Sequence, residues 1–174
     1  MTTTLIQLLA PPCMGKSTMA AGLYHHMNSI GTSSVELIQE PARRRVYANL
    51  PLYGAGQLSI TTELYEYISN VIKANVPIVI VDTHILSPLL YTRDRVATNL
   101  AIDLSKELED KCRCVTLLIT GEEPPYTGEG RSTPDRPSLE GIDVYDAIAY
   151  VKHYKEVDYK TPPGEVLTLL NGLI

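Results

Sequence analysis

The feature that most constrains this chain is the segment from Leu5 to Thr18, LIQLLAPPCMGKST. A short apolar run typical of a buried strand passes through a turn ending in Gly-Lys-Ser-Thr and leads directly into a helical pattern. Strand, loop and helix N-terminus in this order are the context of a phosphate-binding loop, because the loop N–H groups and the helix dipole both favour an anion. We therefore expect nucleotide phosphates to bind at Pro12, Cys13, Met14, Gly15, Lys16, Ser17 and Thr18.

Two side chains of this loop have expected roles. Lys16 is placed to reach the β- and γ-phosphates of ATP, and the Ser17 hydroxyl is placed to bind Mg²⁺. The segment departs from the pattern G-x-x-x-x-G-K-[ST] at its first position, where Ala10 replaces glycine. Because alanine resists a positive φ, the turn must take a conformation at that position which alanine tolerates.

Composition limits the classes of protein to consider. A chain of 174 residues with 44% hydrophobic residues predicts a single globular domain over residues 1–174. The formal net charge of −5 argues against a broad surface for duplex DNA, which requires many lysines and arginines, but leaves room for a local basic pocket. The chain has no Phe and no Trp, so an aromatic ring that stacks on a nucleobase must be one of its 11 tyrosines.

The cysteines and the apolar runs indicate the cellular compartment of the protein. The three cysteines, Cys13, Cys112 and Cys114, have no disulfide-framework spacing, which favours a reducing, cytoplasmic compartment. The Cys-x-Cys pair is too closely spaced for a usual zinc site. We see no signal peptide, and no apolar stretch reaches membrane-spanning length, so we expect no membrane partner.

Hydrophobic periodicity predicts alternating strands and helices. A first helix is expected over about Lys16–Asn28, with Met19, Leu23 and Met27 on its buried stripe. The run VPIVIVDT is continuous and β-branched, as in a strand buried on both faces of a parallel sheet. The predicted fold class is α/β, three layers around a central parallel sheet of about five strands. Besides Leu5–Leu9, the predicted strands are Ser34–Gln39, Val76–Thr83, Cys114–Thr120 and Glu165–Leu170. Further helices are predicted at Gln57–Ala74 and Asp94–Asp110. The second of these helices is expected to bury Val96, Leu100, Leu104 and Leu108.

Charged residues follow several of these strands, and the carboxyl ends of parallel strands meet at one edge of the sheet. Asp82 ends an apolar strand and is expected to orient Mg²⁺ together with Ser17; capping the next turn is the alternative role. Glu40 ends the second strand and is placed to accept a proton from an attacking hydroxyl; a charge that stabilises a helix N-terminus is the alternative.

Candidate substrate-binding residues follow Glu40 along the chain. Arg43, Arg44 and Arg45 point about 100° apart on a short helix, so one of them can reach an acceptor and the others face solvent. Gln57 and Tyr65 can both face the acceptor, although a capped helix start and a core tyrosine are the favoured interpretations of each residue taken alone.

The segment from Gly121 to Pro137 contains almost no aliphatic residues and is rich in proline and glycine. Such a stretch predicts a functional loop or lid of about 17 residues. Its two arginines, Arg131 and Arg136, are candidates to place positive charge over a transferring phosphate. His84, alone near Asp82, is interpreted as structural.

Taken together, these motifs resemble the P-loop kinase group that includes nicotinamide riboside kinase domains and related phage kinase-like ATPases. The resemblance rests on APPCMGKST, IQEPARR, GQLSITTELYEYI, VIVDTHI and, less specifically, YTGEGRSTPDR. It implies the P-loop NTPase fold and an ATP- and Mg²⁺-dependent phosphotransferase with an alcohol group as acceptor. Glu40 matches the acidic residue of that family after its second strand, Gln57 its glutamine, and Arg131 and Arg136 its lid arginines.

We therefore expect a cytoplasmic P-loop kinase that moves the γ-phosphate of ATP to a hydroxyl of a nucleoside, nucleotide or modified nucleobase. Two alternatives stay open. One is a DNA kinase that acts on a hydroxymethylated base or a 5′-hydroxyl end, with nucleic acid bound near Glu40 and Arg43–Arg45. The other is a nucleotide-switch ATPase module that acts through a protein partner.

Overall fold

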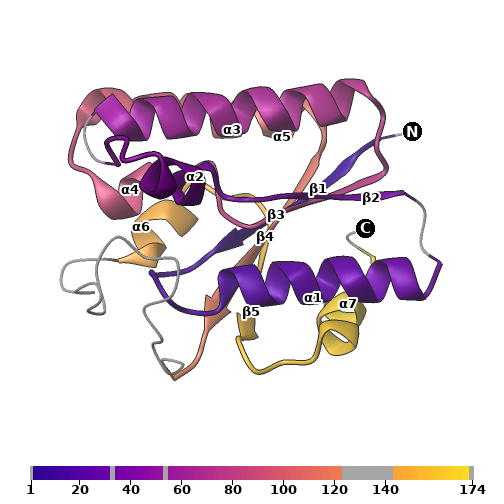
Figure 1. Cartoon of the computed structure of the whole chain (residues 1–174). Helices are drawn as coiled ribbons and strands as arrows, with labels where there is room; N and C mark the ends of the chain where they lie inside the picture. Colours follow the sequence, from indigo (N-terminus) through magenta and orange to yellow (C-terminus); the bar gives the residue numbers. More distant parts are fainter. Residues whose placement is uncertain (1, 32–33, 53–54, 123–142, 173–174) are drawn as a thin grey trace.

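The computed structural model describes residues 2–31, 34–52, 55–122 and 143–172. A five-stranded sheet in the order β2-β3-β1-β4-β5 forms its centre, and every neighbouring pair of strands is parallel (Figure 1). The prediction of an α/β fold around a parallel sheet of about five strands is confirmed. The elements are β1 (Thr4–Leu9), α1 (Lys16–Ser29), β2 (Val35–Ile38), α2 (Pro41–Tyr47), α3 (Ala55–Lys73), β3 (Ile78–Val81), α4 (Pro88–Tyr91), α5 (Arg95–Lys111), β4 (Arg113–Thr120), α6 (Val144–Ile148), β5 (Tyr154–Asp158) and α7 (Pro163–Leu170).

Helices cover both faces of the sheet. Figure 1 shows α3 and α5 along one face and α1 and α7 along the other. The central strand β1 is buried at all its positions, and its side chains alternate between the two cores. Leu8 packs with α1 and α7, whereas Leu5 and Leu9 pack with α3 and α5. This burial on both faces explains why the strand has no polar alternation.

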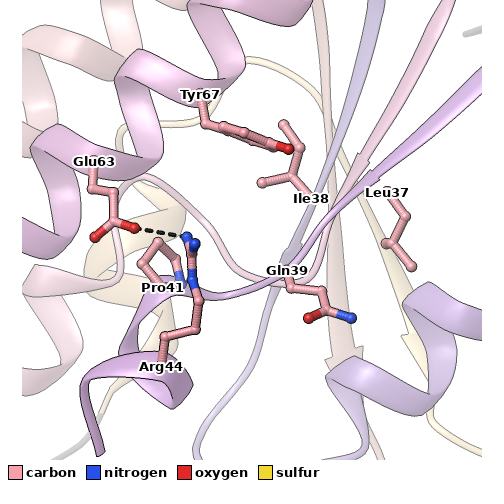
Figure 2. Close-up of a pocket in the computed structure, with 7 residues that line it drawn as sticks. All are labelled: Leu37, Ile38, Gln39, Pro41, Arg44, Glu63 and Tyr67. Atoms are coloured by element: carbon pink, nitrogen blue, oxygen red, sulfur yellow. Dashed lines mark hydrogen bonds and ion pairs between the residues drawn. The ribbon is translucent and has the colours of Figure 1, made fainter. Parts of the chain in front are cut away.

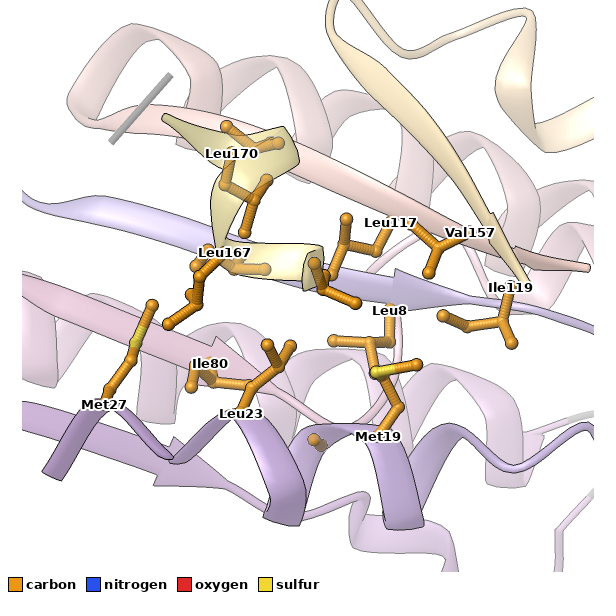
Figure 3. Close-up of a cluster of buried hydrophobic side chains, with 14 of the residues drawn as sticks. Leu8, Met19, Leu23, Met27, Ile80, Leu117, Ile119, Val157, Leu167 and Leu170 are labelled. Atoms are coloured by element: carbon orange, nitrogen blue, oxygen red, sulfur yellow. The ribbon is translucent and has the colours of Figure 1, made fainter. Parts of the chain in front are cut away.

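Helix α1 anchors the loop that precedes it. Met19, Leu23 and Met27 are buried as predicted, and they pack against Leu8 and Ile80 of the sheet (Figure 3). A helix fixed along its whole length by such a stripe holds its N-terminus rigidly at the end of β1, because well-packed side chains leave little room for movement.

The last strand was predicted at the wrong place. Residues Glu165–Leu170 belong to helix α7, where Val166, Leu167 and Leu170 are buried at helical spacing and Pro163 occupies the first turn. The fifth strand is instead β5, whose sequence YKEVD buries only Val157. Strand β5 lies at the end of the sheet order, so its pattern does not show the apolar run of a central strand.

The predicted buried stripe of α5 is only partly confirmed. Leu108 is buried and Leu104 is partly buried against the core, but Val96 is 65% exposed, and the other buried residues of the helix are Ala97, Ala101 and Ser105. Helix α5 packs against α3 and β4, and small side chains allow it to approach them closely. Over the first three turns the buried positions therefore lie one residue beyond the predicted ones, and at Leu108 the two coincide.

The carboxyl ends of β1, β2 and β3 lie together at one edge of the sheet. The backbone N–H of Asp82, just beyond β3, donates to the carbonyl of Ile38, the last residue of β2, at 2.9 Å. This edge is where the loop before α1 begins. Most of the predicted lid, including Arg131 and Arg136, lies outside the described residues. None of the helices in the described ranges combines the length and apolarity that a membrane span requires.

Candidate functional site

The loop between β1 and α1 has the backbone of an anion-binding turn. Gly15, the residue before α1, has φ of 77°, and Cys13 has φ of 65°. Ala10 is not among the described residues with positive φ, so the replacement of the first glycine is accommodated as expected. Helix α1 has no acidic residue in its first turn and no side chain capping it. Its N-terminal dipole and N–H groups are therefore available to a phosphate.

Lys16 extends across this loop. Its Nζ atom donates to the carbonyls of Ala10 at 3.3 Å and Pro11 at 3.4 Å. An ammonium group held there brings positive charge over the concave side of the turn. A bound phosphate is a stronger partner for this group than a neutral carbonyl, because both the donor and the acceptor then carry charge.

Tyr159 is a site residue that sequence reasoning missed. It follows β5 and packs against the loop: a Cβ atom added to Gly15 would lie 3.6 Å from the Cβ of Tyr159. Lys160 Nζ lies 5.4 Å from the centre of the tyrosine ring, within the range of a cation–π contact. The two segments are far apart in sequence and β5 was not recognised, so only the general expectation of a tyrosine near the nucleotide pointed to it.

Asp82 lies at the end of β3, as predicted, and is 7% exposed. Burial raises the pKa of its carboxyl group from 3.8 to about 6, while a hydrogen bond from the Ser17 hydroxyl acts in the opposite direction. Within the described part of the chain, its Oδ1 atom is buried without a hydrogen-bond partner. A buried carboxylate oxygen without a hydrogen-bond donor lowers the stability of the folded protein, so its presence indicates a function, such as binding a cation.

The donor set at this position fits Mg²⁺. Mg²⁺ in nucleotide sites is bound by one or two protein oxygens together with water and phosphate oxygens, rather than by an all-protein cage. The open oxygen of Asp82 and the adjacent Ser17 hydroxyl provide such a pair. In the four described ranges, no group of three or more His, Cys, Asp or Glu residues is arranged to hold a metal.

Glu40 and Arg43 lie close enough to Asp82 to change its pKa. The carboxylate of Glu40 raises the pKa of Asp82, and the guanidinium of Arg43 lowers it, as does the ammonium of Lys16. Glu40 precedes α2, which starts at Pro41, and its side chain makes no capping hydrogen bond to the helix. Glu40 is the N-cap residue of α2, so the alternative role of a charge that stabilises the helix N-terminus stays open beside that of a base.

The neighbouring arginine, Arg44, is paired with helix α3. Its Nη2 atom forms an ion pair with Glu63 Oε1 of α3 at 2.7 Å, and both side chains line a pocket of about 200 Å³ beside β2 (Figure 2). Arg45 also contacts α3, through Ser59 Oγ at 2.9 Å. Of the three consecutive arginines, Arg43 is therefore the one whose charge lowers the pKa of Asp82, whereas Arg44 and Arg45 bond to α3.

The structure places the other two predicted substrate-binding residues in structural contacts. The amide of Gln57, 6% exposed, donates to the carbonyl of Leu52 and holds the segment before α3. The hydroxyl of Tyr65 accepts a hydrogen bond from Lys111, at the C-terminal end of α5, at 2.8 Å. Since α5 leads into the start of β4, this contact lies toward the opposite edge of the sheet, and Tyr65 is not brought to the loop.

The fold and this loop define a class. A parallel sheet in the order 2-3-1-4-5, with the Gly-Lys-Ser-Thr loop after the central strand and an aspartate after its neighbour, is the P-loop NTPase fold. Solved structures agree with this assignment. The structure is similar to a cysteine-to-alanine variant of the APS kinase of Mycobacterium tuberculosis, with 13% sequence identity and a TM-score of 0.56, over 99% of this chain and 96% of that one.

The same APS kinase in complex with AMPPNP and APS also matches, with 13% identity and a TM-score of 0.57, over 99% of this chain and 97% of that one. No family model and no curated protein sequence matches the chain. The likeness is thus one of fold along the whole chain. The particular resemblance to nicotinamide riboside kinase domains and phage kinases is not confirmed.

Proposed function

We propose that this protein is an ATP-dependent phosphotransferase that moves the γ-phosphate to a hydroxyl group of a nucleotide-type small molecule. The observation that carries the proposal is the gathering of Lys16, Ser17, Glu40 and Arg43 around the buried carboxylate of Asp82. Phosphoryl transfer is catalysed mainly by positioning and by neutralising charge, and this group supplies cations, a metal-binding carboxylate and a candidate base at one edge of the sheet.

Each residue has a defined part in the proposed reaction. The N–H groups of residues 12–18 bind the β- and γ-phosphates, and Lys16 exchanges the carbonyls of Ala10 and Pro11 for these phosphates. Mg²⁺, held by Asp82 and Ser17, would neutralise phosphate charge when bound. Tyr159, packed on Gly15, offers its ring to the nucleoside of ATP.

Glu40 and Arg43 face the acceptor in this proposal. The carboxylate of Glu40 has no capping bond to release, so it is available to accept the proton of an attacking hydroxyl. Arg43 is exposed and binds an anionic group of the acceptor. The similar APS kinase has a complex with AMPPNP and APS, which supports a nucleotide rather than an unphosphorylated nucleoside as the acceptor. Arg131 and Arg136 are proposed to close over the transferring phosphate.

The test is transfer of labelled γ-phosphate from ATP to a panel of acceptors. The panel holds nucleoside monophosphates and related nucleotides, nucleosides including nicotinamide riboside, 5′-hydroxyl oligonucleotides and hydroxymethyluracil-containing DNA. Lys106→Ala, at an exposed position on α5, is the matched control for Lys16→Ala. Label on a small nucleotide, lost in Lys16→Ala and kept in Lys106→Ala, supports the proposal. Label on DNA, or release of phosphate without transfer, refutes it in favour of a polymer kinase or an ATPase switch.

A further inference from the structure

The segment that follows Asp82 is tied to the strands on either side of it. Beyond the bond from Asp82 to β2, the N–H of Ile85 donates to Gln7 Oε1 of β1 at 3.0 Å. His84 Nε2 lies 2.8 Å from Thr116 Oγ1 of β4. One short turn thus contacts three strands of the sheet by hydrogen bonds, and both Gln7 and Thr116 are only 2% exposed.

Both ring nitrogens of His84 take part in hydrogen bonds. Its Nδ1 atom accepts from the N–H of Leu86 at 3.0 Å, so the ring hydrogen is on Nε2 and is donated to Thr116 Oγ1. His84 itself is only 2% exposed, so the ring lies in the interior with both of these partners. Because both ring nitrogens of this neutral imidazole are hydrogen-bonded, neither is left to bind a ligand, and the ring links the turn to β4.

The turn is also closed internally. Ser87 Oγ donates to the carbonyl of His84 at 2.6 Å and lies 2.8 Å from Thr83 Oγ1. The backbone on the C-terminal side of Asp82 is therefore fixed by hydrogen bonds from β1, from β4 and within the turn itself. Such a support is needed because a buried carboxylate with an open oxygen gains free energy by moving toward water.

We propose that Thr116 and Gln7, through His84 and the turn at residues 83–87, are positioning residues that hold the carboxylate of Asp82 in place for Mg²⁺. The proposal rests on the proposed function only in taking Asp82 as the metal-binding carboxylate. Residues that orient a metal ligand without touching the metal typically contribute about 10- to 100-fold in metal affinity. We expect these residues to affect the factor by which Mg²⁺ strengthens nucleotide binding, which we call the Mg²⁺ coupling. They are not expected to affect nucleotide binding in the absence of Mg²⁺.

The test compares Thr116→Val with Thr116→Ser. Valine keeps the shape of the side chain and removes the acceptor for His84, whereas serine keeps the hydroxyl. Thr4→Val, a buried threonine at the other end of the same sheet, is the matched control. AMPPNP binding is measured by calorimetry in EDTA and in Mg²⁺, and thermal melting confirms that each variant is folded. The ratio of the two dissociation constants reports the Mg²⁺ coupling.

The expected result is that Thr116→Val loses about 10-fold of this coupling and keeps its affinity in EDTA within about 2-fold. Thr116→Ser and Thr4→Val are expected to keep both. Ser87→Ala, a smaller change at a half-buried position, is expected to lose part of the coupling and provides a second variant if Thr116→Val does not fold. Unchanged coupling in a folded Thr116→Val, or in Ser87→Ala where the valine variant does not fold, would overturn the proposal.

Failure of the proposed function gives a different result. If the unmodified protein shows Mg²⁺ coupling that depends on Thr116 but phosphorylates no acceptor, the kinase assignment fails and the positioning role stands. If the unmodified protein binds AMPPNP equally well with and without Mg²⁺, Asp82 holds no metal and the positioning role is overturned.

Discussion

The buried carboxylate of Asp82 is predicted to lower the stability of the nucleotide-free protein. In the folded state the pKa of this group is about 6, compared with 3.8 ordinarily, mainly because the side chain is buried. Above pH 7 the group is ionised in both states, and the difference corresponds to roughly 3 kcal/mol, since one pKa unit is worth about 1.36 kcal/mol. Asp82→Asn removes the charge and keeps an oxygen that accepts from the Ser17 hydroxyl. We expect the variant to be more stable at pH 7.5 by roughly 3 kcal/mol.

The pH dependence has a definite sign. Because the folded-state pKa of Asp82 is raised, the folded protein binds more protons than the unfolded chain between pH 3.8 and about 6, and stability falls as pH rises through this window. Below pH 3.8 the carboxyl group is neutral in both states, so Asp82→Asn gives no gain there. The advantage of the variant therefore develops between pH 4 and pH 7, roughly the range in which the folded carboxyl group ionises.

The measurement is urea unfolding in EDTA without nucleotide, at pH 4 and pH 7.5. Thermal melting at pH 7.5 gives a second readout, with an expected rise of roughly 6–12 °C for a chain of this length. Asp103→Asn, an exposed carboxylate on α5, is the matched control and is expected to change stability by less than about 0.5 kcal/mol. An Asp82→Asn protein that is equal to or less stable than the unmodified one at pH 7.5 would refute the reasoning.

Four further predictions concern activity and packing. Lys16→Ala should abolish phosphoryl transfer and weaken ATP binding, as measured by labelled transfer and by calorimetry; full activity would contradict the phosphate-loop assignment. Glu40→Gln should keep ATP affinity and lower kcat by about 10²–10⁴-fold, the usual contribution of proton transfer, and an unchanged kcat would exclude Glu40 as the base. Arg131→Ala and Arg136→Ala should mainly lower kcat in steady-state assays, whereas a pure KM effect would make them binding residues. Leu23→Ala, at a position with no exposure, should cost about 2–5 kcal/mol in urea unfolding, and a cost below about 1 kcal/mol would show that the α1 core relaxes freely.

Much of the fold was predictable because its signals are local. The strand at Thr4–Leu9, the loop ending in Gly15 and the stripe on α1 are encoded within one stretch of sequence. Glu40 and Asp82 were recognisable because each follows an apolar strand, and the rule that parallel strands end at one edge predicted that they converge. Strand β5 was not predicted because an edge strand needs no continuous apolar run. The segment of α7 was predicted as a strand because its short apolar sequence fits both a strand and a helix.

The sequence by itself therefore determined the class of the fold, the phosphate loop and the identity of the charged residues at the sheet edge. Only the tertiary structure decided that Arg44 pairs with Glu63 while the charge of Arg43 acts on Asp82, and that Tyr159 packs on Gly15. It also decided that Gln7 and Thr116 support the turn after Asp82. The physical reason is range: loops and helices follow from contacts between near neighbours in the chain, whereas the direction of a side chain and the burial of a charge depend on segments that meet only after the sheet has formed.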